Sequence, residues 1–279
     1  MKKLYVYLLI CILPSILCAQ ASYGTWGKEP AKLPDYNLLD SAKIEVIYYY
    51  RTIDQQQQNI NDYHFILQVG DSVCLYENYG KYRLDSVLSN KTSVTNGEWM
   101  ELIGLYNANS KEYLIENVNK ETLSYYGKVS IDYFTYQEPI PKINWDLSDS
   151  TRMVCGYLCH EATTSFRGRN WKVWYCDIPK GVGPWKLNGL PGLILKAESA
   201  DKEHLFEAIS IRKAQSPIYC KDADKYFKTS RTKFNKALAD YKSDPAKYWK
   251  NTPLAGKDEN GKPLKMPKRK LFHNPLEKE

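Results

Sequence analysis

The stretch from Gly156 to Cys176 constrains the fold of this chain more than any other. Its sequence, GYLCHEATTSFRGRNWKVWYC, has two runs of strand-forming residues that flank Arg167-Gly168, a pair suited to a two-residue turn. A turn of this length places Cys159 directly across from Cys176. The stretch therefore predicts an antiparallel hairpin with a defined register.

Further strand-forming runs occur throughout the first 220 residues, where long apolar stretches with a helical period are nearly absent. Lys43 to Ile53 is rich in tyrosine and β-branched residues, and HFILQV and SVCLYENY flank the turn pair Gly70-Asp71. LILKAES and HLFEAISIRK form another expected pair of strands. Together these runs predict a mainly β protein with an antiparallel sheet.

The pattern changes after Cys220. Aromatic and leucine side chains between Asp222 and Tyr241 recur on one helical stripe, and Asp222 is suited to cap the start of a helix. We therefore predict one helix at about 222–241. With it, residues 22–250 are expected to form a single β-rich domain, followed by a basic, partly extended tail at 251–279.

The first 21 residues have the features of a secretory signal peptide. Two lysines precede an apolar run from Leu4 to Leu17, and the small-residue pattern Ala-Gln-Ala follows at 19–21. The apolar run is shorter than the roughly 20 residues that a membrane span needs. We therefore predict an exported chain with no transmembrane span after cleavage. Cys18 leaves lipidation as an alternative, although the bulky Leu17 does not suit that processing.

The positive charge is concentrated toward the C-terminal end. The whole chain has a formal net charge of +7, which falls to +5 without the two leader lysines. Residues 221–279 carry sixteen Lys or Arg against eight Asp or Glu, which leaves residues 20–220 acidic. A basic face of this kind can bind an anionic lipid or an acidic protein, or can be a solvated helix face with its tail. The sequence has no nucleic-acid-binding motif, so nucleic acid is not an expected partner.

The segment Gly183–Leu195, GPWKLNGLPGLIL, alternates residues that restrict the backbone with residues that relax it. Prolines fix φ and remove a backbone donor, whereas glycines permit angles that other residues avoid. We predict a shaped corner that leads into a buried strand. A phosphate-binding loop is the alternative, but the lysine-hydroxyl ending and the following helix of a P-loop are missing. The corner residues are Gly183, Pro184, Gly189, Leu190, Pro191, Gly192, Leu193 and Ile194.

The hexapeptide GLPGLI lies within this segment, and the sequence from Ile143 to Leu195 resembles the core block of the GLPGLI family, a group of exported proteins found mainly in Bacteroidota. The early DYHFILQVGDSVCLY and the late FHNPLE resemble two other motifs of that family. Cys155 and Cys176 depart from its pattern, which has an aliphatic or β-branched residue and a small polar residue there.

This resemblance implies an antiparallel sheet curled into a half-open barrel, similar to lipoprotein-carrier folds, with the helix against its concave side. The comparison with those carriers is an analogy of fold. The resemblance implies no established biochemical activity, although some members resemble accessory proteins of outer-membrane uptake systems.

Five cysteines remain after the leader, and three of them share one face of the predicted hairpin. Cys159 and Cys176 face each other at a separation close to that of a disulfide, so we predict a bridge between them in an oxidising compartment. Cys155 lies on the same face because strand side chains alternate. The three thiols are therefore also candidates for a copper or zinc site, with buried structural sulfur as the alternative.

Arginine and tryptophan side chains are frequent around the hairpin turn and the corner. Guanidinium and aromatic groups can stack on a sugar or bind an anionic head group, or they can simply cover the sheet. These candidate ligand contacts are Arg167, Arg169, Trp171, Trp174 and Trp185.

The sequence contains no HExxH zinc helix, GxSxG elbow or CxxC redox pair, so we assign no catalytic residue and no cofactor. We expect a non-enzymatic, exported protein with a binding, scaffold or accessory role in the periplasm, at the outer membrane or outside the cell. Its expected partner is a lipid, another anionic ligand or a component of an outer-membrane transport system. The alternatives are a copper-, zinc- or thiol-handling protein and a hydrolase without a recognisable motif.

Overall fold

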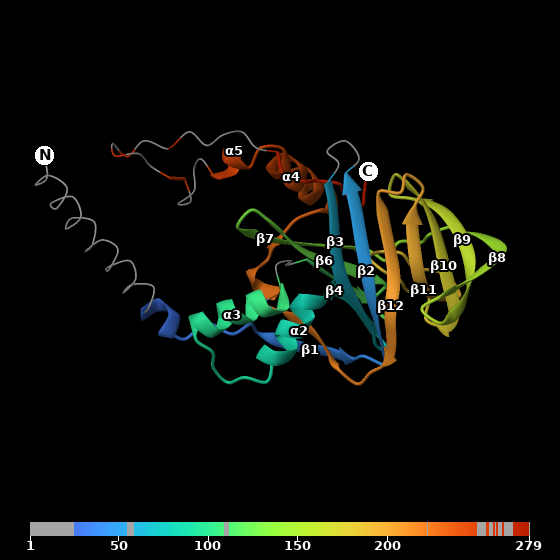
Figure 1. The fold of residues 1–279 in the computed structure, drawn as a ribbon, viewed down its shortest axis with the longest axis horizontal. Coiled ribbons are helices and arrows are strands. Elements are labelled where there is room, and N and C mark those ends of the chain that lie inside the picture. Colours follow the sequence, from blue (N-terminus) through green and yellow to red (C-terminus); the bar gives the residue numbers. More distant parts are fainter. Residues whose placement is uncertain are drawn as a thin grey trace, which may run out of the picture. The chain divides into compact units, whose positions relative to one another are not determined.

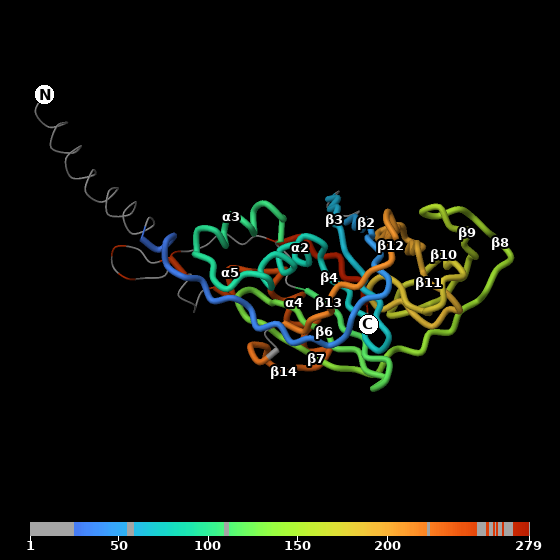
Figure 2. Tube along the Cα trace, turned by 90° about the horizontal axis from the view of Figure 1, so that it is seen from below, coloured from blue at the N-terminus to red at the C-terminus, as the bar shows by residue number. Residues whose placement is uncertain are grey.

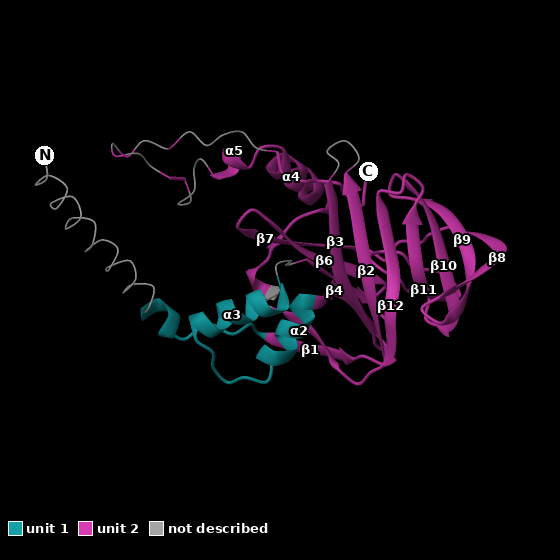
Figure 3. Ribbon diagram, in the orientation of Figure 1, with its two compact units in different colours: residues 1–35, 80–109 teal, residues 36–79, 110–279 magenta. Residues whose placement is uncertain are grey.

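The computed structural model (Figure 1) describes residues 25–54, 59–108, 112–221, 223–249, 255, 256, 259, 261, 264 and 270–278. The predicted signal peptide at 1–21 lies outside the described residues. The chain divides into two compact units, one of residues 1–35 and 80–109 and the other of residues 36–79 and 110–279 (Figure 3). The stretch expected to be one domain, 22–250, is shared between these units because two helices are inserted between consecutive strands.

The larger unit is built around a sheet of twelve strands in the order β14-β7-β6-β5-β4-β3-β2-β12-β11-β10-β9-β8. Neighbouring strands are antiparallel except β14 and β7, and the sheet is open between its two end strands. Figure 2 shows β8–β11 toward one end and β6, β7 and β14 toward the other. The mainly β, antiparallel fold predicted from the sequence is confirmed.

The strands of this sheet are β2 (Ile44–Asp54), β3 (Asn59–Val69), β4 (Val73–Asn78), β5 (Tyr113–Asn117), β6 (Thr122–Val129), β7 (Asp132–Pro139), β8 (Asp146–Val154), β9 (Tyr157–Phe166), β10 (Arg169–Pro179), β11 (Gly192–Ser199), β12 (His204–Lys213) and β14 (Phe227–Lys228). A separate two-stranded sheet pairs β1 (Tyr36–Ser41) with β13 (Pro217–Lys221).

The predicted hairpin at Gly156–Cys176 is formed by β9 and β10. Cys176 lies directly opposite Cys159, as the two-residue turn requires. Arg167 and Gly168 both have positive φ, 53° and 72°, which a type I′ turn needs at both central positions. The predicted register is confirmed because it depends only on this short turn.

The expectation of a single C-terminal helix is wrong. Besides a helical turn at 25–28, the described residues form α2 (Tyr79–Leu88), α3 (Asn96–Tyr106), α4 (Arg231–Ser243) and α5 (Pro245–Trp249). α3 begins with a capping box formed by Thr95 and Glu98, and none of its residues is buried. Within the described residues, no helix has both the length and the apolar character needed to cross a bilayer.

The helix expected at 222–241 begins later, at Arg231. Its cap is Ser230, whose hydroxyl accepts a hydrogen bond from the backbone N–H of Lys233, whereas Asp222 lies outside the described residues. The residues before the cap form a 3-10 turn, Ala223–Lys225, and the short strand β14. The aromatic stripe therefore combined residues of the sheet edge with residues of the helix.

The corner segment connects β10 with β11 and requires glycine at two positions for different reasons. Gly189 has a φ of 88°, a backbone angle that residues other than glycine rarely adopt. At Gly192, a Cβ would lie 1.8 Å from the carbonyl oxygen of Cys176. This close approach lets Leu193 and Ile194 enter β11 fully buried.

The hydrophobic core of the larger unit lies on one side of the sheet, which we call the inner face. Tyr48 of β2 and Leu195 of β11 are fully buried there, and the corner adds Leu187 to the same cluster. Phe234 of α4 packs nearby against Tyr136 and its neighbours on β6 and β7. The corner and α4 thus both pack against the inner face.

Candidate binding site

The larger unit contains a cavity on the inner face, which we call the inner cavity. It lies between the sheet, the corner, α4 and residues 272–277, and its volume is about 240 Å³. Protein interiors contain few voids larger than a water molecule. A cavity that holds one water molecule needs a volume of only roughly 10–15 Å³. The inner cavity is therefore a candidate binding site rather than a packing defect.

Aromatic side chains form most of the wall of the inner cavity. The rings of Tyr50 and Phe206 stack with their centroids 4.3 Å apart, and those of Tyr125 and Tyr136 stack at 4.9 Å. Both pairs are directly opposite on neighbouring strands, so the pleat of the sheet holds the rings in place. Further aromatic lining residues are Phe65, Tyr76, Trp185, Phe234 and Phe272.

The tyrosine hydroxyls in this wall differ in their hydrogen bonding. Tyr50 shares a 2.8 Å hydrogen bond with Nδ1 of His204, and the Tyr136 hydroxyl accepts one from the Lys186 ammonium at 3.1 Å. The Tyr76 hydroxyl is buried and has no hydrogen-bond partner among the described residues. Leaving a buried hydroxyl unpaired costs about 1–3 kcal/mol.

Charged groups occur on the side of the inner cavity formed by α4 and its surroundings, where Glu112, Lys242 and His273 line it. The pKa of Glu112 is raised because desolvation of its carboxyl outweighs the field of Lys242 and a hydrogen bond from Tyr125. The pKa of His273 is lowered, first by burial and then by the nearby lysines Lys242 and Lys270. These groups make one part of the wall polar.

A cluster of buried ion pairs holds Glu277 in the wall. The Lys186 ammonium, which is 0% exposed, lies 2.6 Å from the carboxylates of both Glu138 and Glu277. Arg231 of α4 pairs with the other oxygen of Glu277 at 2.7 Å, and Arg167 pairs with Glu138 at 2.9 Å. Lys186 and Arg231 outweigh the effect of burial and lower the pKa of Glu277. The corner, the sheet, α4 and the C-terminal residues are thus joined at one point.

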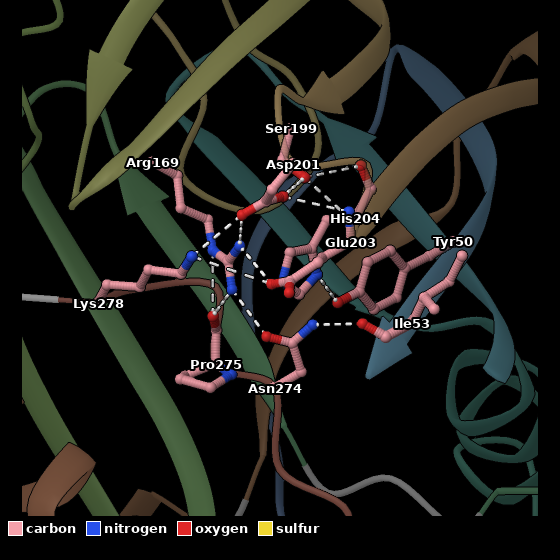
Figure 4. A network of polar contacts seen from close by, with 10 residues as sticks. All are labelled: Tyr50, Ile53, Arg169, Ser199, Asp201, Glu203, His204, Asn274, Pro275 and Lys278. Carbon is pink, nitrogen blue, oxygen red and sulfur yellow. Dashed lines mark hydrogen bonds and ion pairs between the residues drawn. The ribbon is translucent and has the colours of Figure 1, made fainter. Parts of the chain in front are cut away.

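A second polar cluster holds Asn274 and Pro275 (Figure 4). Arg169, which is 1% exposed, forms ion pairs with Asp201 at 2.6 Å and with Glu203 at 3.0 Å. The same guanidinium donates to the Asn274 side-chain oxygen at 2.8 Å and to the Pro275 carbonyl at 2.6 Å. Contacts with Arg169 at one end and with Lys186 and Arg231 at the other therefore hold residues 274–277 in the cavity wall.

The five predicted ligand contacts do not line one site, although the rings of Trp171 and Trp185 lie with their centroids 6.0 Å apart. Arg167 and Arg169 belong to the two internal ion-pair clusters, and Trp171 is buried in the core. Trp174 lies between the Arg152 guanidinium and the Lys196 ammonium, 4.9 Å and 5.8 Å from the ring centroid. Of the five, Trp185 lines the inner cavity.

The predicted cysteine pair is adjacent, and its thiols are free. Cys159 and Cys176 are both buried on β9 and β10, while Cys155 is half-buried in the preceding turn. The neighbouring Cys159 thiol lowers the pKa of Cys176, and the Cys159 thiol donates a hydrogen bond to the Tyr157 carbonyl at 3.5 Å. Among the described residues, no three His, Cys, Asp or Glu side chains are grouped to hold a metal ion, so Cys155, Cys159 and Cys176 form no such group. The disulfide stays a prediction.

Few of the residues that shape the inner cavity could be predicted from sequence patterns. Tyr76 lies in a segment expected to be a strand, and Lys242 directly follows the helix expected at 222–241, without any motif around either residue. Lys186 stands inside the corner, and Glu277 inside FHNPLE, so both occur in segments that the sequence singled out. What the sequence did not indicate is the ion pair between Lys186 and Glu277, which joins those two segments.

No family model matches this chain, and no curated protein matches it. Among solved structures, it is similar to PNGF-II, determined in the C2 and P21 space groups. In both, the sequence identity is 16%, the TM-score is 0.47, and the match covers 72% of this chain and 33% of that chain. This chain thus matches about a third of the length of PNGF-II.

Proposed function

We propose that this chain is an exported, non-enzymatic binding protein that holds a small, mainly apolar molecule in the inner cavity. The observation that carries the proposal is the aromatic wall around 240 Å³ of unfilled space. Apolar ligand surface that enters this space leaves water, which is favourable, and a few polar groups in the wall can fix its orientation. Lys242 and Glu112, which line the inner cavity, are such groups.

The wall is suited to binding because it is fixed in advance. The stacked rings come from strands in a continuous sheet, and the ion-pair clusters around Arg169 and Lys186 fix residues 274–277. A preformed site does not need to order loops or side chains when the ligand enters, so more of the interaction free energy contributes to affinity.

The ion-paired groups beside the inner cavity are suited to holding its wall rather than to catalysis. Glu138, Glu277 and Lys186 satisfy one another in buried ion pairs, and Glu277 has a lowered pKa. A general acid or base needs a pKa near the working pH and access to the substrate. Groups held in this way are suited to maintaining the wall.

The cellular role belongs to the same proposal. The leader-like pattern at 1–21 supports export to the periplasm or the outer membrane, and the GLPGLI segment supports membership of that exported family. We further propose that the open sheet, with α4 on its inner face, works as a half-open barrel similar to lipoprotein carriers. A role beside an outer-membrane transport system would suit a protein that binds an apolar cargo outside the cytoplasm.

The test is binding of N-phenyl-1-naphthylamine, an uncharged apolar dye, followed by its fluorescence with the purified protein. The wild-type chain is expected to bind it saturably. Leu238→Trp places a larger side chain on the α4 face that lines the inner cavity, so it should weaken binding at least tenfold. Lys233→Trp adds the same side chain at an exposed position of α4 and should leave binding unchanged. Equal binding by both variants, or no binding by the wild type, would overturn the proposal.

A further inference from the structure

The face of α4 that lines the inner cavity ends in a cation. Phe234, Leu238 and Lys242 follow one another at intervals of four residues, so they lie along one side of the helix, and all three line the cavity. Lys242 lies in the last turn, where its carbonyl accepts a hydrogen bond from the N–H of Leu271. An apolar stripe that ends in an ammonium group matches a molecule with an apolar body and an anionic end.

Lys242 differs from the other cations around the inner cavity in having no fixed partner. Its ammonium has no hydrogen bond or ion pair with any residue in the described part of the chain. Lys186 and Arg231, in contrast, are each paired with Glu277 at less than 3 Å. The unpaired ammonium of Lys242 is therefore available to a ligand.

Glu112 is the carboxyl of the wall that interacts electrostatically with Lys242, and it has a hydrogen bond with Tyr125. The raised pKa of Glu112 weakens it as a counter-ion. A ligand carboxylate that reaches the ammonium from the cavity side meets a cation without an ion pair in the described part of the chain.

The carboxylate of Glu277, which also lines the inner cavity, is neutralised by its own partners. It pairs with Lys186 and Arg231, so it is not available to a cationic ligand. Lys242 is left as the cation of the wall without an ion pair in the described part of the chain. Aromatic rings alone would also accept an organic cation, but the ammonium of Lys242 opposes one.

We infer that the ligand of the inner cavity is an amphiphile with one carboxylate, which pairs with Lys242 while the hydrocarbon part lies against the aromatic wall. This inference rests on the proposed function, because it names the class of molecule that the same cavity takes. It selects an anionic amphiphile over a neutral one and over an organic cation.

The test compares three twelve-carbon chains that differ in the charge of their head group. Laurate, dodecanol and dodecyltrimethylammonium, each below its micelle concentration, are used to displace N-phenyl-1-naphthylamine from the wild-type protein. Laurate is expected to displace the dye at a concentration at least fivefold lower than dodecanol, and the cation is expected to be weakest. Equal potency of laurate and dodecanol, or a stronger effect of the cation, would overturn the inference while dye binding still supports the proposed function.

Two lysine variants on one helix complete the test. Lys242→Gln should raise the displacing concentration of laurate to that of dodecanol and leave dodecanol unchanged. Lys236→Gln is the matched control, since its ammonium is exposed and pairs with Asp240 at 2.7 Å, and it should keep the wild-type order. If Lys242→Gln weakened all three chains equally, Lys242 would be a structural part of the wall and the inference would be wrong. Failure of the dye to bind the wild type would instead count against the proposed function.

Discussion

The ammonium of Lys186 lies 2.6 Å from the carboxylate of Glu277, and both side chains are almost completely withdrawn from water. The two residues are 91 positions apart in the chain. Their ion pair joins the corner after β10 to the C-terminal residues, and the same carboxylate binds Arg231 at the start of α4. The inner cavity therefore depends on a contact between two segments that are far apart in sequence.

Removing the charge of Lys186 should strongly destabilise the fold. Lys186→Met keeps much of the side-chain volume but leaves the buried carboxylates of Glu138 and Glu277 with one cation fewer. Breaking a buried pair from one side costs about 3–5 kcal/mol. We expect a loss of this size in the free energy of unfolding, measured by urea titration.

Lys172→Met is the matched control for that variant. Lys172 forms an ion pair with Glu161 at 3.2 Å, but its side chain is about half exposed. Exposed pairs contribute roughly 0–1 kcal/mol, so this variant should remain close to the wild type. Equal stability of Lys186→Met and the wild type would show that the pair does not hold the C-terminal residues.

A methyl group at Gly192 should also destabilise the protein. Its Cβ would lie 1.8 Å from the Cys176 carbonyl oxygen, so the backbone of β10 or β11 must move. We expect Gly192→Ala to lower the free energy of unfolding by about 3 kcal/mol or more, because neither strand can shift without disturbing the core. Gly104→Ala is the control: no atom lies within 4 Å of that Cβ in α3, and replacing a helical glycine should stabilise by roughly 0.5–1 kcal/mol. Similar effects at the two positions would contradict this account.

The predictable parts of the fold are those that depend on neighbouring residues. The turn at Arg167-Gly168 fixed the register of β9 and β10 because both strands are contiguous with it. The start of α4 was misplaced because Phe227 pairs with β7, a contact that no local pattern indicates. α3 was missed although Trp99, Leu102, Ile103 and Tyr106 recur at helical spacing after the capping box of Thr95 and Glu98.

The candidate site was less predictable than the fold for the same reason. The aromatic wall combines strands from both halves of the sheet, and its charged cluster joins Glu138, Lys186 and Glu277. The sequence drew attention to the corner and to FHNPLE separately, since their composition is unusual. Only the folded chain shows that these two segments meet.

The cysteine pair on β9 and β10 makes a prediction about oxidation. Cys159 and Cys176 are directly opposite, so removal of one hydrogen from each thiol by an added disulfide oxidant should link them with little change in the backbone. We expect peptide mass mapping to find a Cys159–Cys176 bridge and to find Cys74 and Cys220 as thiols. A bridge from Cys159 to either of those two cysteines would contradict the register, and Cys176→Ser should leave Cys159 without an intramolecular bridge.

The buried imidazole of His204 should make stability depend on pH. Burial, and then the Arg169 guanidinium, lower the pKa of His204 to about 3. The pKa of a histidine in an unfolded chain is about 6.5. Between these values the unfolded chain binds a proton that the folded chain does not, so stability is lost as the pH falls below about 6.5. From pH 7.5 to pH 5, this one group should lower the free energy of unfolding by about 2 kcal/mol.

The measurement is a series of urea titrations between pH 7.5 and pH 5 on the wild type, His204→Gln and His160→Gln. His204→Gln loses the hydrogen bond with Tyr50 and should be less stable at every pH, but its stability should fall by about 2 kcal/mol less across this range. The remaining dependence combines opposite contributions: burial lowers the pKa of His273, so stability is lost as the pH falls, whereas burial raises the pKa of Glu116 to about 7, so stability is gained. His160→Gln replaces a half-exposed histidine near Asp177 and should keep the wild-type slope. If His204→Gln kept the full slope, protonation of the unfolded chain at another group would have to explain the pH dependence.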